Sequence, residues 1–253
     1  MLYHGSPIPI SRGTSFVPGE GTRLQSFFLT PDIGTAALYA GPSGVVYGTS
    51  QSFEDVLDAR WSWDSKCPAP LSPSEEETIY SELAKHGFSP ESLPPLDASL
   101  FSYAEFSSAP SWLQIVHDDF LPDSVPVFER ERICKSLISQ CGYQSVITME
   151  SGDGIGEDIA RRHVDGSNWS AAARRGYQTV MDAIYEAEWC PVLAVLSQPP
   201  AIDDMTSIPA ADILEGAGSR MELYRVATDV PQVLCRDLIG IARDMESRVA
   251  PGC

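Results

Sequence analysis

The chain has 253 residues, of which 43% are hydrophobic, and its 17 basic and 35 acidic side chains give a formal net charge of −18. This hydrophobic content supports a folded core and excludes wholesale disorder, and no apolar run reaches the ~18 residues of a membrane span. A negative field of this size repels phosphate backbones, so it disfavours nucleic acid as a partner and favours a protein or a small molecule. The simpler alternative is that the acidity only promotes solubility.

The cysteines and histidines do not form a metal-binding or disulfide pattern. The six cysteines are scattered without a C-x-x-C pair, and the four histidines do not fall at ligand spacing with them. We therefore predict reduced, mostly buried thiols and no metal site. The cysteines are Cys67, Cys134, Cys141, Cys190, Cys235 and Cys253.

The first sixty residues predict strands and one helix in close succession. Leu2-Tyr3-His4 and Phe27-Phe28-Leu29 are short apolar strands. Thr30-Pro31-Asp32 has the form of a helix start, with the Thr30 hydroxyl as the cap and Pro31 at the first helical position. Apolar residues at helical spacing then predict a helix over 33–39, and two further strands are expected at 45–47 and 56–58.

Residues 60–125 differ from this pattern because prolines interrupt them repeatedly. Short helical patterns fit between the prolines at 75–86 and 111–120, which indicates an insertion of helices and loops and not a sheet. A helix over 128–141 and a strand over 144–149 follow.

Gly152-Asp153-Gly154-Ile155-Gly156 comes directly after that strand. A phosphate-binding loop is conceivable there, but the spacing matches neither the dinucleotide nor the P-loop fingerprint, so we predict a turn. The remaining pattern predicts a helix over 169–188 and strands over 192–196 and 220–226.

Two stretches near the start and one near the end together resemble the ADP-ribosyltransferase superfamily, most closely its His-Tyr-Glu branch of poly(ADP-ribose) polymerases and diphtheria-type toxins. Tyr3-His4-Gly5-Ser6 is similar to the first motif of that branch. Phe27-Phe28-Leu29-Thr30 through Ala37-Leu38-Tyr39-Ala40 is similar to its strand–turn–helix, with Phe28 and Tyr39 eleven residues apart. Met221-Glu222-Leu223-Tyr224-Arg225-Val226 is similar to the late strand that carries the glutamate.

The resemblance implies a site for NAD as co-substrate. Its catalytic residues would be Glu222, His4 and Tyr39, and the residues that bind NAD would be His4, Gly5, Ser6, Phe28, Tyr39 and Arg23. Gly5 would admit the carboxamide to the backbone, Phe28 and Tyr39 would sandwich the nicotinamide ring, and His4 and Glu222 would bind ribose hydroxyls. Many members of the family have a serine three residues before the helix tyrosine, where this chain has Ala36, with Thr35 beside it.

Each of these residues also has a simpler interpretation. A histidine on an apolar strand, or a Phe and a Tyr on a neighbouring strand and helix, is by default core packing, and a single strand glutamate usually faces solvent. Glu150, directly after the 144–149 strand, is the alternative glutamate, and Arg12 is the alternative to Arg23 for the pyrophosphate. His117, next to Asp118, is a weaker candidate base because no nucleophile is identifiable.

The resemblance implies an α+β fold with a split, mixed two-sheet core and surrounding helices, in a single domain over 1–253 with 60–140 as a helical insertion. The implied function is mono-ADP-ribosyl transfer from NAD to a protein acceptor, as in bacterial effectors and toxins, with 60–140 as the region that recognises the acceptor. The alternatives are an NAD glycohydrolase and an inactive protein-binding module. A nucleic-acid modifying enzyme would need Arg161, Arg162, Arg174 and Arg175 to form a basic platform.

Localisation follows from the N-terminus and the resemblance together. No basic region and no apolar region precede His4-Gly5-Ser6-Pro7, so a signal peptide is not predicted. We expect a cytoplasmic protein, or one delivered into a host cytosol as an effector.

Overall fold

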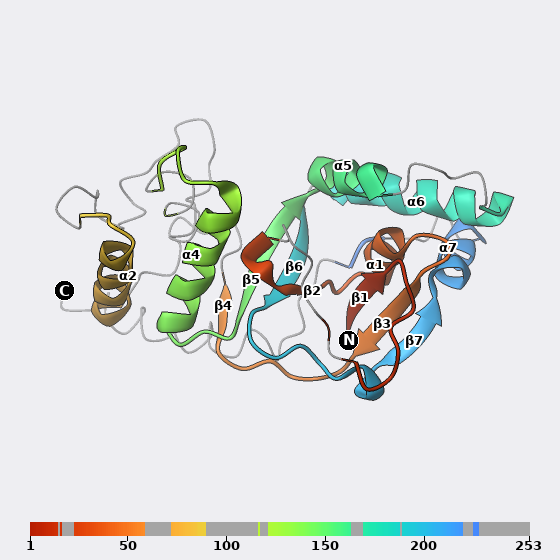
Figure 1. The fold of residues 1–253 in the computed structure, drawn as a ribbon. Coiled ribbons are helices and arrows are strands. Elements are labelled where there is room, and N and C mark those ends of the chain that lie inside the picture. The colour runs from red at the N-terminus through yellow and green to blue at the C-terminus, as the bar shows by residue number, and fades with distance from the viewer. Residues whose placement is uncertain are drawn as a thin grey trace, which may run out of the picture.

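The computed structural model describes residues 1–14, 16, 23–58, 72–89, 116, 121–162, 169–187, 189–219 and 225–227. These residues form a mixed α+β structure with strands in two sheets (Figure 1). The strands are β1 (Leu2–Ser6), β2 (Phe27–Leu29), β3 (Val45–Thr49), β4 (Val56–Asp58), β5 (Ser145–Ser151), β6 (Trp189–Val195) and β7 (Thr206–Pro209).

The helices at 33–40, 73–85, 127–140 and 171–187 agree with the predicted ones to within two residues at each end, whereas those at 152–162 and 210–219 were not predicted. The prediction of an α+β fold is confirmed at this level, and the helices expected inside 60–140 are present where that region is described. The α-helices are α1 (Ile33–Ala40), α2 (Pro73–Lys85), α4 (Val127–Gln140), α5 (Gly152–Arg162), α6 (Ala171–Ala187) and α7 (Ala210–Ser219), with 3-10 turns η1 (Arg23–Gln25) and η6 (Ile202–Asp204).

The two sheets meet at a single point between β1 and β2. The first sheet has the order β1-β3-β7 and is antiparallel; the second has the order β2-β6-β5-β4, in which only β4 and β5 are parallel. An isolated bridge between Tyr3 and Thr30 joins the sheets. This bridge makes one face continuous from β1 to β4.

Side-chain alternation along the strands defines that continuous face, called here the α1 face. Phe28, Ala194 and Val146 lie side by side on it because they are register partners across β2, β6 and β5. Two residues further along come Val192 and Thr148, and then Cys190 and Glu150. On β1 the face carries Tyr3 and Gly5, because Tyr3 pairs with Thr30, which alternates with Phe28.

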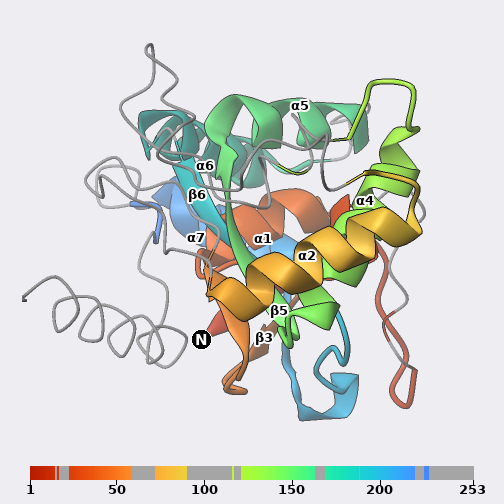
Figure 2. The same cartoon turned by 90° about the vertical axis from the view of Figure 1, so that its left-hand side faces the viewer.

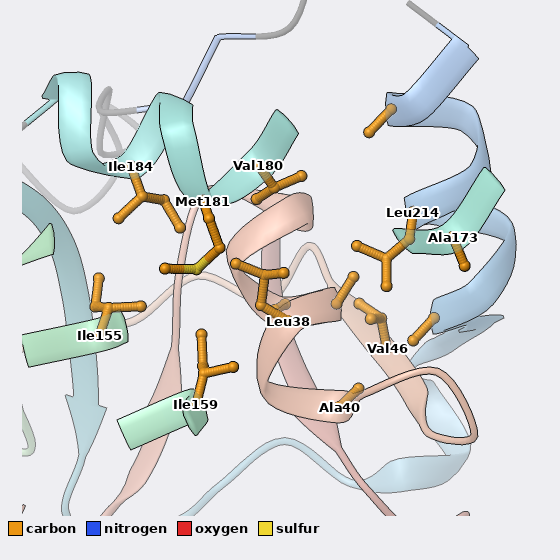
Figure 3. Close-up of a cluster of buried hydrophobic side chains, with 14 of the residues drawn as sticks. Leu38, Ala40, Val46, Ile155, Ile159, Ala173, Val180, Met181, Ile184 and Leu214 are labelled. Carbon is orange, nitrogen blue, oxygen red and sulfur yellow. The ribbon is translucent and has the colours of Figure 1, made fainter. Parts of the chain in front are cut away.

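Two separate hydrophobic clusters cover this face from its two ends. At one end α2 and α4 pack on Phe28, Val146 and Ala194, which we call the α4 cluster; Figure 2 shows α2 in front, beside α4. At the other end α1, α5, α6 and α7 form the α1 cluster, shown in Figure 3, which reaches Cys190. Its labelled members are Leu38, Ala40, Val46, Ile155, Ile159, Ala173, Val180, Met181, Ile184 and Leu214.

The predicted start of α1 is wrong by two residues. The helix cap is Asp32 and not Thr30, because the Asp32 carboxylate accepts hydrogen bonds from the backbone N–H of Thr35 at 2.6 Å and from its hydroxyl at 2.8 Å. A carboxylate at this position satisfies a free helix N–H and also suits the positive end of the helix dipole.

The predicted turn at 152–156 is also wrong, because α5 begins at Gly152 directly after β5. Ser151 caps the helix by accepting the N–H of Gly154 at 3.1 Å. The glycines serve helix packing: a Cβ on Gly152 would lie 2.9 Å from the carbonyl oxygen of Ile184, and one on Gly156 would lie 2.3 Å from the Tyr185 hydroxyl. Neither forms a phosphate-binding loop.

The last predicted strand falls mostly outside the described residues. Residues 220–224 are among those not described, and Arg225–Ala227, which are described, belong to no strand. The 111–120 helix likewise lies outside the described residues except for Val116. None of the described helices is long and apolar enough to span a lipid bilayer.

The Glu75 carboxyl of α2 is expected to make the stability of the fold sensitive to acid. Burial raises the pKa of the Glu75 carboxyl, but hydrogen bonds from Ser72 and from the Tyr143 hydroxyl, at 2.6 Å, outweigh it and hold the pKa below its ordinary value of 4.5. A lowered pKa contributes stability that is present above pH 4.5 and is lost as the pH falls through the folded-state pKa.

We therefore predict that Glu75→Gln lowers the free energy of unfolding by about 1 kcal/mol at pH 7 and that the difference shrinks below pH 4. Urea titrations at pH 7 and pH 3.5 measure this. Glu77→Gln, on the exposed side of the same helix, is the control. Equal loss at both pH values would contradict the assignment.

Candidate functional site

The bridge at Tyr3 fixes the direction of the backbone polar groups of β1. Tyr3 exchanges both of its backbone hydrogen bonds with Thr30, at 2.8 and 2.9 Å. Successive residues of a strand point these groups to opposite sides, so those of His4 point to β3 and those of Gly5 point again to the β2 side. Continued pairing would join Gly5 to Phe28, but the bridge stays isolated.

His4 occupies the place where the two strands separate. Its Nδ1 lies 2.9 Å from the carbonyl oxygen of Phe28, the atom that continued pairing would give to Gly5. A carbonyl only accepts, so Nδ1 carries a proton and, in the neutral ring, Nε2 is an acceptor. The N–H and C=O of Gly5 are therefore directed into the split between the sheets.

Aromatic rings fix the orientation of the His4 imidazole on the opposite face from α1. The ring centroid of His4 lies 4.2 Å from that of Phe27 and 5.1 Å from that of Phe16, the latter edge-on. Phe27 belongs to a cluster formed with Leu2, Leu29, Phe53, Ile147, Leu193 and Val195. Phe16 and Phe27 were not predicted as site residues, although alternation in the Phe27-Phe28 pair implies that only one of them shares a face with Tyr39.

Gly5 allows α1 to lie directly on β1. A Cβ on Gly5 would be 1.9 Å from the carbonyl oxygen of Ala36 and 2.8 Å from the backbone nitrogen of Ala40. The missing side chain is thus required by helix packing, whatever else approaches the glycine. The backbone of Ala36 and Ala40 is therefore the part of α1 that contacts Gly5.

Tyr39 and Glu150 meet across 111 residues of sequence. The Tyr39 hydroxyl donates to Glu150 Oε2 at 3.2 Å, and both side chains are partly buried. Glu150 lies near the end of β5, opposite Cys190 of β6, so the carboxylate sits at the edge of the α1 cluster. The structure therefore brings the alternative glutamate, Glu150, to the predicted tyrosine.

Asp32 supplies a second carboxylate close by. It is 3% exposed, caps α1 through Thr35, and also accepts the N–H of Ala227 at 3.1 Å. The Thr35 hydroxyl is therefore part of the helix cap and does not replace the serine that the family has at Ala36. Asp32 also fixes the C-terminal segment at Ala227 to the start of α1.

The two carboxylates, Asp32 and Glu150, affect the acidity of the Cys190 thiol. Burial, followed by the charges of Asp32 and Glu150, raises the pKa of Cys190 to about 12. With its pKa raised, Cys190 stays a protonated thiol at pH 8, and the thiol does not react with alkylating agents as the thiolate does. Alkylation of Cys190 by iodoacetamide at pH 8 should therefore be slow in the folded protein and fast in urea. Peptide mass spectrometry measures both rates. Equal rates in both states would contradict the buried, negatively charged environment.

The other residues predicted for the site lie in several different parts of the structure. Phe28 packs in the α4 cluster and Tyr39 in the α1 cluster, so the two rings do not form a sandwich in this structure. The Ser6 hydroxyl donates to the carbonyl of Ile8 at 2.6 Å and fixes the loop after β1. Arg23 is described only in its backbone, within η1, and Arg12 is exposed. Glu222 and His117 lie outside the described residues.

Of the four arginines named for a basic platform, Arg161 and Arg174 contact groups of the chain itself, Arg175 is exposed, and the side chain of Arg162 lies outside the described residues. Arg161 pairs with Glu157 at 2.9 Å and approaches Asp158 at 3.9 Å, and Arg174 donates to the carbonyl oxygen of Trp169. Two of the platform positions are thus engaged within the chain.

Helix α4 holds the turn that leads into β2. Glu131 of α4 accepts the N–H of Leu24 at 2.7 Å, and Lys135 donates to the carbonyl of Gln25 at 2.7 Å. Leu24 and Gln25 have left-handed φ angles of 56° and 44°, which are strained for residues with a side chain. Because α4 fixes this turn, it also fixes β2 and the Phe28 carbonyl that receives His4.

We predict that Glu131→Ala destabilises the fold by about 2 kcal/mol, since a buried charged acceptor is lost, with the largest rise in amide hydrogen exchange over residues 23–29. Glu131→Gln, which retains an acceptor oxygen, is the matched control and should lose less. Exchange that rises only within α4 would show that the contact does not support β2.

No family model, curated protein or solved structure matches the chain. Two separate arrangements are present: the His4 imidazole held by the Phe28 carbonyl on one face, and the Tyr39 hydroxyl hydrogen-bonded to Glu150 on the other.

Proposed function

We propose that the protein is an ADP-ribosyltransferase that cleaves NAD at the split between β1 and β2 and transfers ADP-ribose to a protein acceptor. The observation that carries this proposal is the hydrogen bond from the Tyr39 hydroxyl to Glu150 Oε2, at 3.2 Å, on the α1 face. It supplies the tyrosine and glutamate that the resemblance requires, with Glu150 in place of Glu222.

The residues at the split suit the parts of NAD. The Gly5 N–H and C=O form a donor and acceptor pair that matches a flat carboxamide. The Tyr39 ring is an aromatic surface for the cationic nicotinamide. His4, on the other face of the split with its Nδ1 held by the Phe28 carbonyl, is the imidazole that the resemblance assigns to a ribose hydroxyl. A dinucleotide passing through the split would reach both faces.

The chemistry required of the protein is positioning and charge stabilisation. Breaking the bond between ribose and nicotinamide leaves positive charge on the ribose, and the bonding electrons depart with the neutral nicotinamide. Glu150 contributes a negative charge at that position and accepts a hydroxyl proton of the ribose in a hydrogen bond. The acceptor nucleophile then forms the new bond to the ribose carbon and loses its proton, which Glu150, hydrogen-bonded to Tyr39, accepts as the base.

An NAD glycohydrolase uses the same site, with water as the acceptor, and an inactive binding module would retain the fold alone. Purified protein incubated with NAD separates the three. Nicotinamide release measured by chromatography, together with a mass increase on proteins of a cell lysate, supports transfer. Release with only free ADP-ribose identifies hydrolysis, and no release above a buffer blank contradicts the enzyme proposal.

A further inference from the structure

The junction between the two clusters on the α1 face contains a buried hydroxyl. Thr148 of β5 and its register partner Val192 of β6 lie between the Val146–Ala194 pair, which belongs to the α4 cluster, and the Glu150–Cys190 pair at the α1 cluster. Thr148 is 6% exposed and Val192 is 5% exposed. The junction is therefore enclosed, with one polar side chain in it.

The Thr148 hydroxyl has no hydrogen-bond partner, and among the described residues it is the one buried side-chain N or O atom in this condition. A buried hydroxyl without a partner lowers the stability of the fold, and a valine of the same shape would avoid that cost. An unsatisfied buried group in a folded protein calls for an explanation, and a partner that arrives with a ligand is one.

The residues next to Thr148 indicate which chemical group of a ligand would be the hydrogen-bond partner of its hydroxyl. Glu150 follows two residues later on the same face, about 7 Å along the strand, and is partly exposed. A neutral hydroxyl and a carboxylate at this spacing on one face suit two hydroxyls of one sugar ring, since a carboxylate only accepts and sugar hydroxyls donate. The carboxamide is already provided for by the backbone pair of Gly5.

We propose that Thr148 Oγ1 binds a ribose hydroxyl of NAD, one step deeper along β5 than Glu150. This inference rests on the proposed function and assigns to its site a residue that the motifs do not contain. Thr148 thereby selects for the sugar part of the co-substrate, and the hydrogen bond exists only when the ligand is bound.

The test is Thr148→Val, which removes the hydroxyl and keeps the shape. We expect the variant to melt at or above the wild-type temperature without ligand, because an unsatisfied group is gone. Its Kd for ADP-ribose should rise about tenfold, while its Kd for nicotinamide stays unchanged, both measured by calorimetry. Thr148→Ser should keep the ADP-ribose affinity within about threefold.

Thr179→Val is the matched control, because the Thr179 hydroxyl is buried in α6 but already donates to the carbonyl of Arg175 at 2.9 Å. An unchanged ADP-ribose affinity in Thr148→Val, or an equal loss for nicotinamide, overturns the inference. If Thr148→Val does not fold, Thr148→Ala decides by the same two affinities. Wild-type protein that binds neither NAD nor its two fragments contradicts the proposed function itself, which is a distinguishable result.

Discussion

Gly176→Ala is expected to destabilise the protein severely. A Cβ at Gly176 of α6 would lie 1.6 Å from the carbonyl oxygen of Leu214 and 2.4 Å from its carbonyl carbon. Both atoms are backbone, so no side-chain rotation relieves the overlap, and α6 and α7 would have to separate. We expect a loss of about 3 kcal/mol or more in the free energy of unfolding.

The reciprocal contact shows that the close approach involves both helices. A Cβ on Gly218 of α7 would lie 2.8 Å from the carbonyl oxygen of Ala172 and 2.8 Å from the nitrogen of Gly176. Separation of the helices would open the α1 cluster, which includes Ala173, Val180 and Leu214 (Figure 3). The same cluster supports α1 and therefore Tyr39.

Gly216→Ala is the matched control, since it lies in the same α7 helix and nothing lies within 4 Å of its Cβ position. Alanine is a better helix former, so this variant should gain about 0.5–1 kcal/mol. Urea unfolding followed by circular dichroism measures both variants. Equal stabilities for Gly176→Ala and Gly216→Ala would show that α6 and α7 do not cross in this way.

Glu150→Gln is expected to reduce nicotinamide release by about 10²–10³-fold while leaving the melting temperature close to that of the wild type. The substitution keeps the size of the side chain and an acceptor for the Tyr39 hydroxyl, but it removes the negative charge from the developing ribosyl cation. Tyr39→Phe, which removes only the hydroxyl, should cost less, about tenfold. Initial rates at saturating NAD measure these changes.

Two further variants are measured beside Glu150→Gln. Glu157→Gln removes an exposed carboxylate of α5 that pairs with Arg161, and its rate should match the wild type. Glu222→Gln tests the glutamate that the sequence resemblance selected. If Glu222→Gln abolishes release and Glu150→Gln does not, the transferase proposal stands but Glu150 is not its catalytic carboxylate.

The sequence predicted the local elements of the site well, because they depend on short-range patterns. The strands at Leu2 and Phe27 and the helix containing Tyr39 were recognisable from apolar spacing over a few residues. The errors at Thr30 and Gly152 are also local. At Thr30, the Asp32 carboxylate two residues later is the stronger helix cap, although Thr30-Pro31 matched the sequence pattern of a helix start. At Gly152, the glycines resembled a turn in composition, but the close contact between α5 and α6 requires them.

The pairing of Tyr39 with Glu150 could not be predicted with the same assurance. It depends on the order β2-β6-β5-β4, in which β6 lies between β2 and β5 although it follows both in sequence. No spacing in the chain encodes that order. The unsatisfied hydroxyl of Thr148 depends in addition on where the two helical clusters end, which is a property of packing and not of pattern.

The most direct test of the account is a structure of the wild-type protein crystallised with NAD or with nicotinamide and ADP-ribose. We predict the carboxamide on the backbone of Gly5, the nicotinamide ring against Tyr39, and a ribose hydroxyl within hydrogen-bond distance of Glu150. A ligand bound elsewhere, with the split between β1 and β2 unchanged, would contradict the account.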